Sequence, residues 1–368
     1  MAKKAPKSDI SRTKKITFQN AIRGKFCLRH SAKKYLQQAW QKLSNFSWHK
    51  TADYGRRIWH KIGHLTQFIS DTWKSLLYCS LTFLVVYYLL GSKISEKIDT
   101  SRVYTIPKDV SEISQTADCA AFLIRREVDD KMWTANLPFI FPAAILDNMP
   151  NFQIGIISAV RDVNAALKQI QNISETQRED LQKAHKLLSY SPYVWLQSKQ
   201  DGFGLAPSAN TQYRKAAKSL NKFNLRQKFV SSSADLPKIL TVLSRKLKKN
   251  IAKSESYWRE HVGDWFDCKA DDVFYYNRGY AFALWQMCKA LGNDYKKAIL
   301  VANAYEDWTY LLSSLQQAAE FSPFYVRNGN PQSLTAPNHL LAQNYFLVRA
   351  LSALEKICNL TEDTADAD

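Results

Sequence analysis

The sequence predicts an all-α protein in which a single N-terminal transmembrane helix is followed by a globular domain of about eight helices. Apolar residues recur every three or four positions along most of the chain, and the alternation typical of strands is nowhere sustained. If residues 75–92 form a helix, this helix carries apolar side chains on every side. The 368 residues are 46% hydrophobic and include 18 Tyr and 18 Phe, which is sufficient for a sizeable core.

The N-terminal arm is strongly basic. Residues 1–74 hold 17 of the 51 Lys and Arg residues but only 3 of the 33 acidic residues. We expect residues 1–30 to be a basic disordered tail. Residues 31–74 are expected to form a basic amphipathic helical region beside a membrane, with cations facing anionic headgroups. The apolar stripe of this region is formed by Tyr54, Ile58, Ile62, Leu65, Ile69 and Trp73.

Residues 75–92, SLLYCSLTFLVVYYLLGS, are predicted to be the transmembrane helix. Eighteen helical residues span about 27 Å, close to the roughly 30 Å of a hydrocarbon core. A buried core helix is the alternative, but no other segment of the chain is apolar all round. Aromatic and basic side chains before and after the run can reach the headgroups. The candidate membrane-interface residues are Arg56, Arg57, Lys61, Trp73, Lys74 and Lys93.

The apolar run is expected to be an uncleaved signal anchor, because no small-x-small cleavage pattern follows it. The basic excess before it predicts that residues 1–74 are cytoplasmic and that the rest lies across the membrane. Close to the run the basic residues are balanced on the two sides, so this orientation depends on the wider arm. We expect a helical domain over residues 93–360 and an acidic tail over residues 361–368.

Turn and capping signals divide the body into helices. The apolar spacing predicts helices over 113–128, 152–170 and 213–223, and Ser174 to Gln177 reads as a capping box that opens another helix. Residues 191–209 form an aromatic and glycine-bearing connection, which suits a surface feature over a groove. Further helices are expected over 235–251, 271–292, 294–315 and 338–354. Asp235, Asp271, Asp294 and Asn338 would begin these four helices, and Gly292 would end the helix that begins at Asp271.

The segment ILDNMPNFQIG, residues 145–155, is the most distinctive sequence segment in the chain. Asp147 or Asn148 can accept backbone N–H groups as an N-cap, and Pro150 is tolerated in a first helical turn. The stretch is therefore either a helix cap or part of a recognition surface. Arg278 lies on an otherwise apolar helix face, where it needs a carboxylate such as Asp147 or Asp271, or reaches water at the edge.

Catalytic and metal-binding motifs are not found. The sequence has no phosphate-binding glycine loop, HExxH, GxSxG or CxxC. His60 and His64 have helical spacing but no acidic or Cys partner nearby. The acid pairs Asp129/Asp130 and Asp271/Asp272 and the helix-start His339 are typical of helix ends. We therefore expect no enzyme activity, no cofactor and no metal.

Three segments resemble an uncharacterised bacterial inner-membrane family, domain of unknown function 2333. They are LDNMPNFQIGIISAVRD (146–162), DDVFYYNRGYAFAL (271–284) and APNHLLAQNYFLVRA (336–350). The resemblance implies a single-pass protein of a Gram-negative bacterium with a globular domain after the anchor, and it supplies no reaction. It also points to a shared constellation, which would form a recognition surface. Its candidate residues are Asp147, Asn148, Pro150, Asp271, Asp272, Arg278, Asn338 and His339.

The function expected from the sequence is a membrane-anchored binding or scaffold protein of the Gram-negative envelope. It would sit in the inner membrane with a cytoplasmic N-terminus and a periplasmic domain. The expected partners are anionic lipids at the basic arm and an envelope protein or a second copy of the chain. One alternative is a periplasmic hydrolase of an envelope polymer that uses the Asp residues and His339. Another is a membrane tether for nucleic acid through the basic arm, although no nucleic-acid-binding motif accompanies it.

Overall fold

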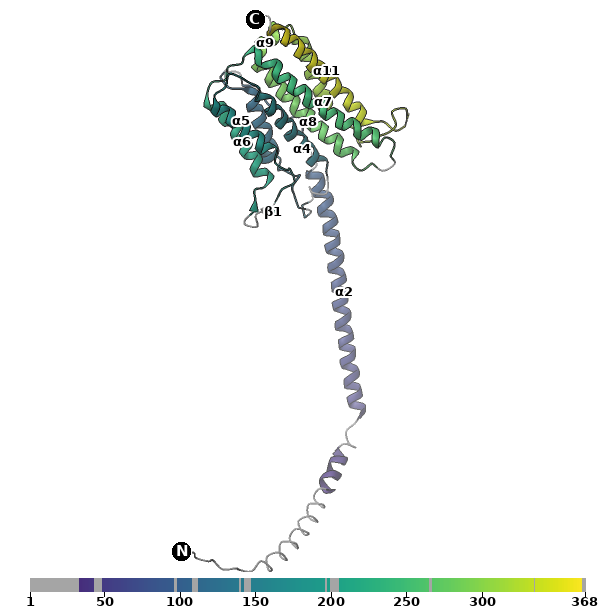
Figure 1. The fold of residues 1–368 in the computed structure, drawn as a ribbon. Helices are drawn as coiled ribbons and strands as arrows, with labels where there is room; N and C mark the ends of the chain where they lie inside the picture. The colour runs from purple at the N-terminus through teal and green to yellow at the C-terminus, as the bar shows by residue number, and fades with distance from the viewer. Residues whose placement is uncertain are drawn as a thin grey trace, which may run out of the picture. The chain divides into compact units, whose positions relative to one another are not determined.

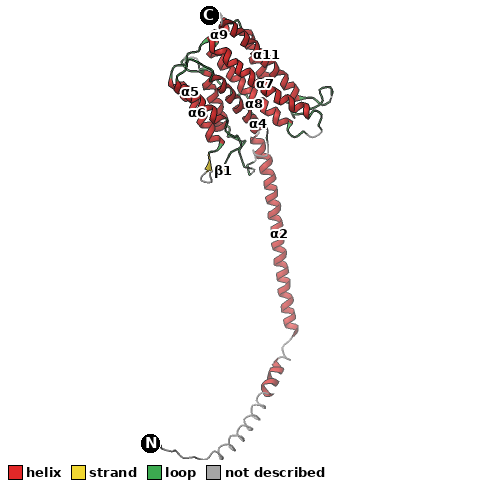
Figure 2. Cartoon of the chain, in the orientation of Figure 1, coloured by secondary structure: helices red, strands yellow, loops and turns green. Residues whose placement is uncertain are grey.

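The computed structural model describes residues 33–42, 48–95, 98–107, 112–138, 140–141, 147–195, 197–198, 205–264, 267–333 and 335–365 (Figure 1). The basic tail expected over residues 1–30 lies outside the described residues, as does Cys27. Most of the described chain is helical, and the only strands within it are two residues long (Figure 2). The all-α prediction is confirmed.

The apolar run lies in a single long helix, α2 (Trp48–Ser95), and residues 33–42 are also helical. The region expected at the membrane surface and the expected transmembrane helix are thus continuous from Trp48 onward. At 1.5 Å per residue the 48 residues of α2 extend about 70 Å, more than a bilayer core. Of the described helices, only the one over residues 53–91 is long and apolar enough to cross a membrane.

The body consists of nine α-helices within the described residues, where the sequence predicts about eight. They are α3 (Gln115–Arg125), α4 (Asn148–Leu167), α5 (Glu175–Leu188), α6 (Ala209–Arg226), α7 (Leu236–Glu260), α8 (Ala270–Asp294), α9 (Lys296–Val301), α10 (Tyr305–Glu320) and α11 (His339–Ala365). A π-helical turn, Arg126–Asp130, extends α3, and a 3-10 turn, Ser233–Asp235, precedes α7. The strands β1 (Gln197–Ser198) and β2 (Leu205–Ala206) pair antiparallel.

The helices of the body pack around α8. Helix α4 lies along α8, α10 packs on both α8 and α11, and α11 lies along α7; Figure 1 shows α4, α7, α8 and α11 side by side. On the other side α3 contacts α6 and α8, and α5 pairs with α6. The apolar stripes expected from the sequence face inward, and large members such as Phe152, Phe223 and Phe274 are fully buried.

Two glycines allow α4 and α8 to approach closely. A Cβ atom added at Gly155 would collide with the backbone carbonyl of Tyr276, and one added at Gly279 would collide with the carbonyl of Phe152. The neighbours in both cases are backbone atoms, which cannot move aside as a side chain can. The glycines therefore set the distance between the two helices that carry most of the candidate site residues.

The helix starts agree with the sequence at three places. Ser174 and Gln177 form the expected capping box of α5. Asn338 accepts a bond from the amide of Leu341 through Oδ1 at 2.8 Å, and Pro150 stands in the first turn of α4. Asp147 is the N-cap residue of α4, but its side chain makes no capping hydrogen bond.

The predicted ends of α8 are wrong. Its N-cap residue is Lys269 rather than Asp271, so Asp271 and Asp272 both lie in the first turn. Its C-terminus lies beyond Gly292, because the helix continues to Asp294. The absence of a side chain at Gly292 instead makes room for the indole of Trp308, which a Cβ atom there would contact.

The prediction that Asp294 begins the next helix is wrong. Asp294 instead caps α3, which is distant in the sequence. Its carboxylate accepts bonds from the backbone amides of Gln115 and Thr116, at 2.9 and 3.0 Å, and from the hydroxyls of Ser114 and Thr116. The two amides belong to the first turn of α3, where backbone N–H groups have no partner within the helix. The expected helix over 294–315 is divided into α9 and α10, and Asn303 between them has a positive φ of 52°.

The chain end also differs from the expected acidic tail. Residues 361–365 continue α11, and Thr361 in this stretch is buried. The last three residues lie outside the described part of the chain. The five cysteines within the described part are free, and Cys119, Cys288 and Cys358 are buried, where a thiol packs as a small apolar group.

A buried ion pair stands in the π-helical turn after α3. Nη1 of Arg126 contacts Oε1 of Glu127, and both side chains are almost completely buried. Arg126 also donates to the carbonyl of Asp99, and its guanidinium lies 4.8 Å from the ring centre of Phe282. The next acids, Asp129 and Asp130, face outward and pair with Arg214 and Arg102, so this acid pair has a structural role.

Candidate functional site

Three carboxylates gather where α4 and α8 begin. Asp271 and Asp272 stand in the first turn of α8, and Asp147 precedes α4. Asn151 holds the group together, because its Nδ2 donates to Oδ1 of Asp272 at 2.6 Å and to the carbonyl of Asp147 at 2.9 Å. Two of the three segments that resemble the bacterial family, residues 146–162 and 271–284, therefore meet in space at this point.

Asp271 and Asp272 hold their protons more tightly than ordinary carboxyl groups do. Burial is the main cause that raises the pKa of Asp272 to about 6, and the negative charges of Asp147 and Asp271 add to it. The pKa of Asp271 is also raised, first by burial and then by Asp147. Asp272 is consequently a carboxyl group that can exchange a proton near neutral pH.

This arrangement makes stability depend on pH. The folded protein binds the proton of Asp272 more tightly than the unfolded chain does, so this stabilisation is complete below the usual Asp pKa of 3.8 and is lost as the pH rises towards about 6. We expect Asp272→Asn to remove part of the decrease in Tm between pH 4 and pH 7. Thermal unfolding of both proteins across this range tests it, and an unchanged pH profile would contradict the raised pKa.

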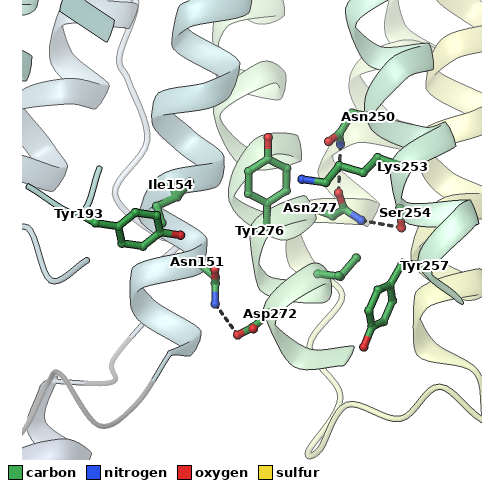
Figure 3. A pocket seen from close by; sticks show the side chains of 11 residues that line it. Asn151, Ile154, Tyr193, Asn250, Lys253, Ser254, Tyr257, Asp272, Tyr276 and Asn277 are labelled. Atoms are coloured by element: carbon green, nitrogen blue, oxygen red, sulfur yellow. Dashed lines mark hydrogen bonds between the residues drawn. The ribbon is translucent and has the colours of Figure 1, made fainter. Parts of the chain in front are cut away.

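A cavity of about 230 Å³ adjoins Asp272 between α4, α7 and α8 (Figure 3). Helix α4 contributes Asn151 and Ile154, and α8 contributes Asp272, Val273, Tyr276 and Asn277. Helix α7 contributes Asn250, Lys253, Ser254 and Tyr257. Tyr193, from the connection that the sequence placed over a groove, completes the lining and is 66% exposed. The cavity thus combines aromatic rings, amides and one charge of each sign.

Buried amides fix the wall between α7 and α8. Nδ2 of Asn250 donates to Oδ1 of Asn277 at 3.0 Å, and Nδ2 of Asn277 donates to the hydroxyl of Ser254 at 2.9 Å, as the dashed lines in Figure 3 mark. Such a chain of bonds sets the orientation of both amides before any ligand arrives.

A second chain of bonds connects the last helix to the cavity. The hydroxyl of Tyr257 donates to Asp267, and Nδ2 of Asn328 lies 3.4 Å from the other oxygen of Asp267. Nδ2 of Asn338 donates to Oδ1 of Asn328 at 2.9 Å. Asn338 therefore supports the cavity indirectly and does not line it.

His339 and Arg278 lie apart from the carboxylates. Nδ1 of His339 accepts the backbone amide of Arg327 at 3.0 Å, and burial lowers the pKa of its ring. Nε of Arg278 donates to the carbonyl of Ala319 at 2.9 Å. Within the described ranges Arg278 has no carboxylate within ion-pair distance, so neither Asp147 nor Asp271 is its partner. Arg278 is buried, which also contradicts the alternative that it reaches water.

The membrane-interface candidates on α2 have exposed side chains. Arg56, Arg57, Lys61, Trp73 and Lys74 all project from the helix surface, and Trp73 is 69% exposed. Arg56 and Lys74 lie 3.5 and 3.9 Å from Asp53 and Asp71 on the preceding turns. The backbone of Lys93 belongs to α2, but its side chain lies outside the described part.

Most residues that line the cavity were not predicted as site residues from the sequence. Asn250, Ser254 and Tyr257 recur at helical spacing on α7, beside the apolar stripe of that helix. A polar stripe next to an apolar one is usually a solvated face, and only the partner helix shows otherwise. Asn151 offered the better signal, because it stands inside the stretch LDNMPNF that carries the family resemblance.

Among the described residues, no three His, Cys, Asp or Glu side chains are placed to hold a metal ion. The chemistry that the cavity offers is hydrogen bonding by amides and hydroxyls, stacking on tyrosine rings, and charge at Asp272 and Lys253.

Comparison with known proteins identifies a family. The family model described as "Uncharacterized protein conserved in bacteria (DUF2333)" matches residues 133–234 and 227–363, which include α4 to α10, nearly all of α11 and the whole cavity. No curated protein and no solved structure matches the chain significantly.

Proposed function

We propose that this chain, which belongs to the uncharacterised bacterial family DUF2333, is a single-pass inner-membrane protein whose helical domain binds an envelope component in the periplasm. The cavity between α4, α7 and α8 would be the recognition site. Helix α2 would anchor the domain in the bilayer.

The exposed apolar surface of α2 carries the proposal. Leu76, Leu84 and Leu90 keep 57%, 46% and 61% of their surface exposed, and none of the most apolar window of the helix is buried. A soluble protein rarely leaves so large an apolar surface uncovered, whereas lipid tails would cover it.

The charge distribution supports the direction of insertion. The basic arm before α2 would stay in the cytoplasm, and its lysines and arginines would contact the anionic inner leaflet. The body after α2 is nearly balanced, with 34 of the 51 basic and 30 of the 33 acidic residues. Such a body can be carried across the membrane.

Fusions to the C-terminus test this topology. We expect alkaline phosphatase fused after Asp368 to be active and a fluorescent protein that matures only in the cytoplasm to stay dark. The same reporters fused before Met1 are the matched control and should give the opposite result. A cytoplasmic C-terminus would contradict both the orientation and the periplasmic binding function.

One observation favours a second function, hydrolysis of an envelope polymer. Asp272, with its pKa of about 6, stands in a cavity with two further carboxylates beside it, as a proton donor in glycosidic cleavage would. His339 would have no part, because it does not line the cavity and its Nδ1 accepts the backbone amide of Arg327. Release of soluble fragments from purified peptidoglycan, abolished by Asp272→Asn, would support hydrolysis, and binding without release would exclude it for that polymer.

A further inference from the structure

A second hollow, of about 310 Å³, continues the cavity towards the basic face of α7. Asn250, Lys253 and Tyr276 line both hollows, so the two form one groove. The added lining consists of Arg161 and Asp162 from α4 with Lys246 and Lys249 from α7. Two members of the basic cluster Arg245, Lys246, Lys248 and Lys249 on α7, Lys246 and Lys249, thus face a groove.

Positive charge prevails in this second hollow. Asp162 is its one carboxylate among the lining residues, and Nε of Arg161 and Nζ of Lys246 each lie 3.5 Å from Oδ1 of Asp162. Lys249 and Lys253 add two further cations. The pKa of the neighbouring His185 is lowered by burial and then by Lys168, Lys246 and Arg161, which agrees with a positive local potential.

Negative charge prevails at the other end of the groove. Asp272 lines it there, and Asp147 and Asp271 act on Asp272 from beside it. Lys253 stands between the ends, with Nζ 5.6 Å from the ring centre of Tyr276, and Figure 3 shows its ammonium group beside the Tyr276 ring and away from Asp272. The groove is therefore bipolar, and a ligand that complements it carries charges of both signs.

We propose that the groove binds a small amino phosphate, with its phosphate among Arg161, Lys249 and Lys253 and its primary ammonium at Asp272. Several cations around one carboxylate suit a phosphate better than a singly charged carboxylate. The carboxylate and the tyrosine rings suit an ammonium group. This ligand class deepens the binding function proposed above and rests on it. The group can come from a free amino phosphate or from a phosphatidylethanolamine headgroup.

Calorimetry on the full chain in a non-ionic detergent tests the proposal. We expect O-phosphoethanolamine to bind about tenfold more tightly than inorganic phosphate or ethanolamine alone, because only it engages both ends. Lys249→Met is expected to weaken its binding about tenfold. The matched control is Lys248→Met, which removes an exposed lysine of the same helix that does not line the groove and should change little.

Asp272→Asn separates a bipolar site from a simple anion site. In this variant O-phosphoethanolamine should bind no more tightly than phosphate. If the preference survives, or if none of the three probes binds, the proposal is wrong. Tighter binding of short-chain phosphatidylethanolamine than of O-phosphoethanolamine would support a lipid source, and the reverse order a free ligand. The binding result does not depend on the reporter fusions, so the failure of one can be told from the failure of the other.

Discussion

Gly279→Ala is expected to destabilise the helical body by about 3 kcal/mol. Helix propensity alone predicts the opposite sign, because alanine is favoured over glycine in a helix by about 1 kcal/mol. Packing dominates here, since the new methyl group would overlap the carbonyl of Phe152 and push α4 away from α8. Chemical denaturation of the full chain in detergent measures the change.

Gly63→Ala is the matched control for this substitution. A Cβ atom at Gly63, within α2, meets no atom within 4 Å, so the same chemical change should leave stability unchanged or raise it slightly. Gly155→Ala, on the facing helix, should reproduce the loss seen at Gly279. If Gly279→Ala proves as stable as the parent protein, the close crossing of α4 and α8 is not correct.

The second large effect is expected at the buried pair of Arg126 and Glu127. Glu127→Ala leaves the guanidinium of Arg126 buried without its carboxylate, which typically costs about 3–5 kcal/mol. The carbonyl of Asp99 and the ring of Phe282 remain as contacts but carry no compensating negative charge. Denaturant unfolding again provides the measurement.

A double substitution distinguishes a buried charge from lost packing. Arg126→Met together with Glu127→Met removes both charges and should be less destabilising than Glu127→Ala alone. Glu112→Ala provides an exposed comparison, because Glu112 pairs with Lys228 at the surface and its loss should change little. Equal losses in the single and double variants would show that the pair is not an energetic unit.

The helices of the body could be predicted because each has a local signal. The capping box at Ser174 and the apolar stripe from Phe152 are contained within a few turns of chain, and both are confirmed. The failures lie where a distant partner decides. Asp294 resembles a cap for the residues that follow it, yet its carboxylate accepts the amides at the start of α3. Gly292 resembles a helix end, yet it makes space for Trp308.

The candidate site could be predicted only in part, for the same reason. Asp147 and Asp272 are brought together as the family resemblance suggested, because α4 and α8 begin side by side. His339 belongs to the same set of motif residues, but its ring accepts the backbone amide of Arg327 in the loop before α11. The groove itself depends on how α7 lies against α4 and α8, and no spacing within α7 indicates that.

Membrane extraction tests most directly whether α2 crosses a bilayer. Membranes from cells that make the full chain are washed with alkaline carbonate, which releases peripheral proteins but not transmembrane ones. We expect the full chain to remain in the pellet and a variant that lacks residues 75–92 to be released. Release of the full chain would contradict the membrane anchor, and with it the placement of the binding domain.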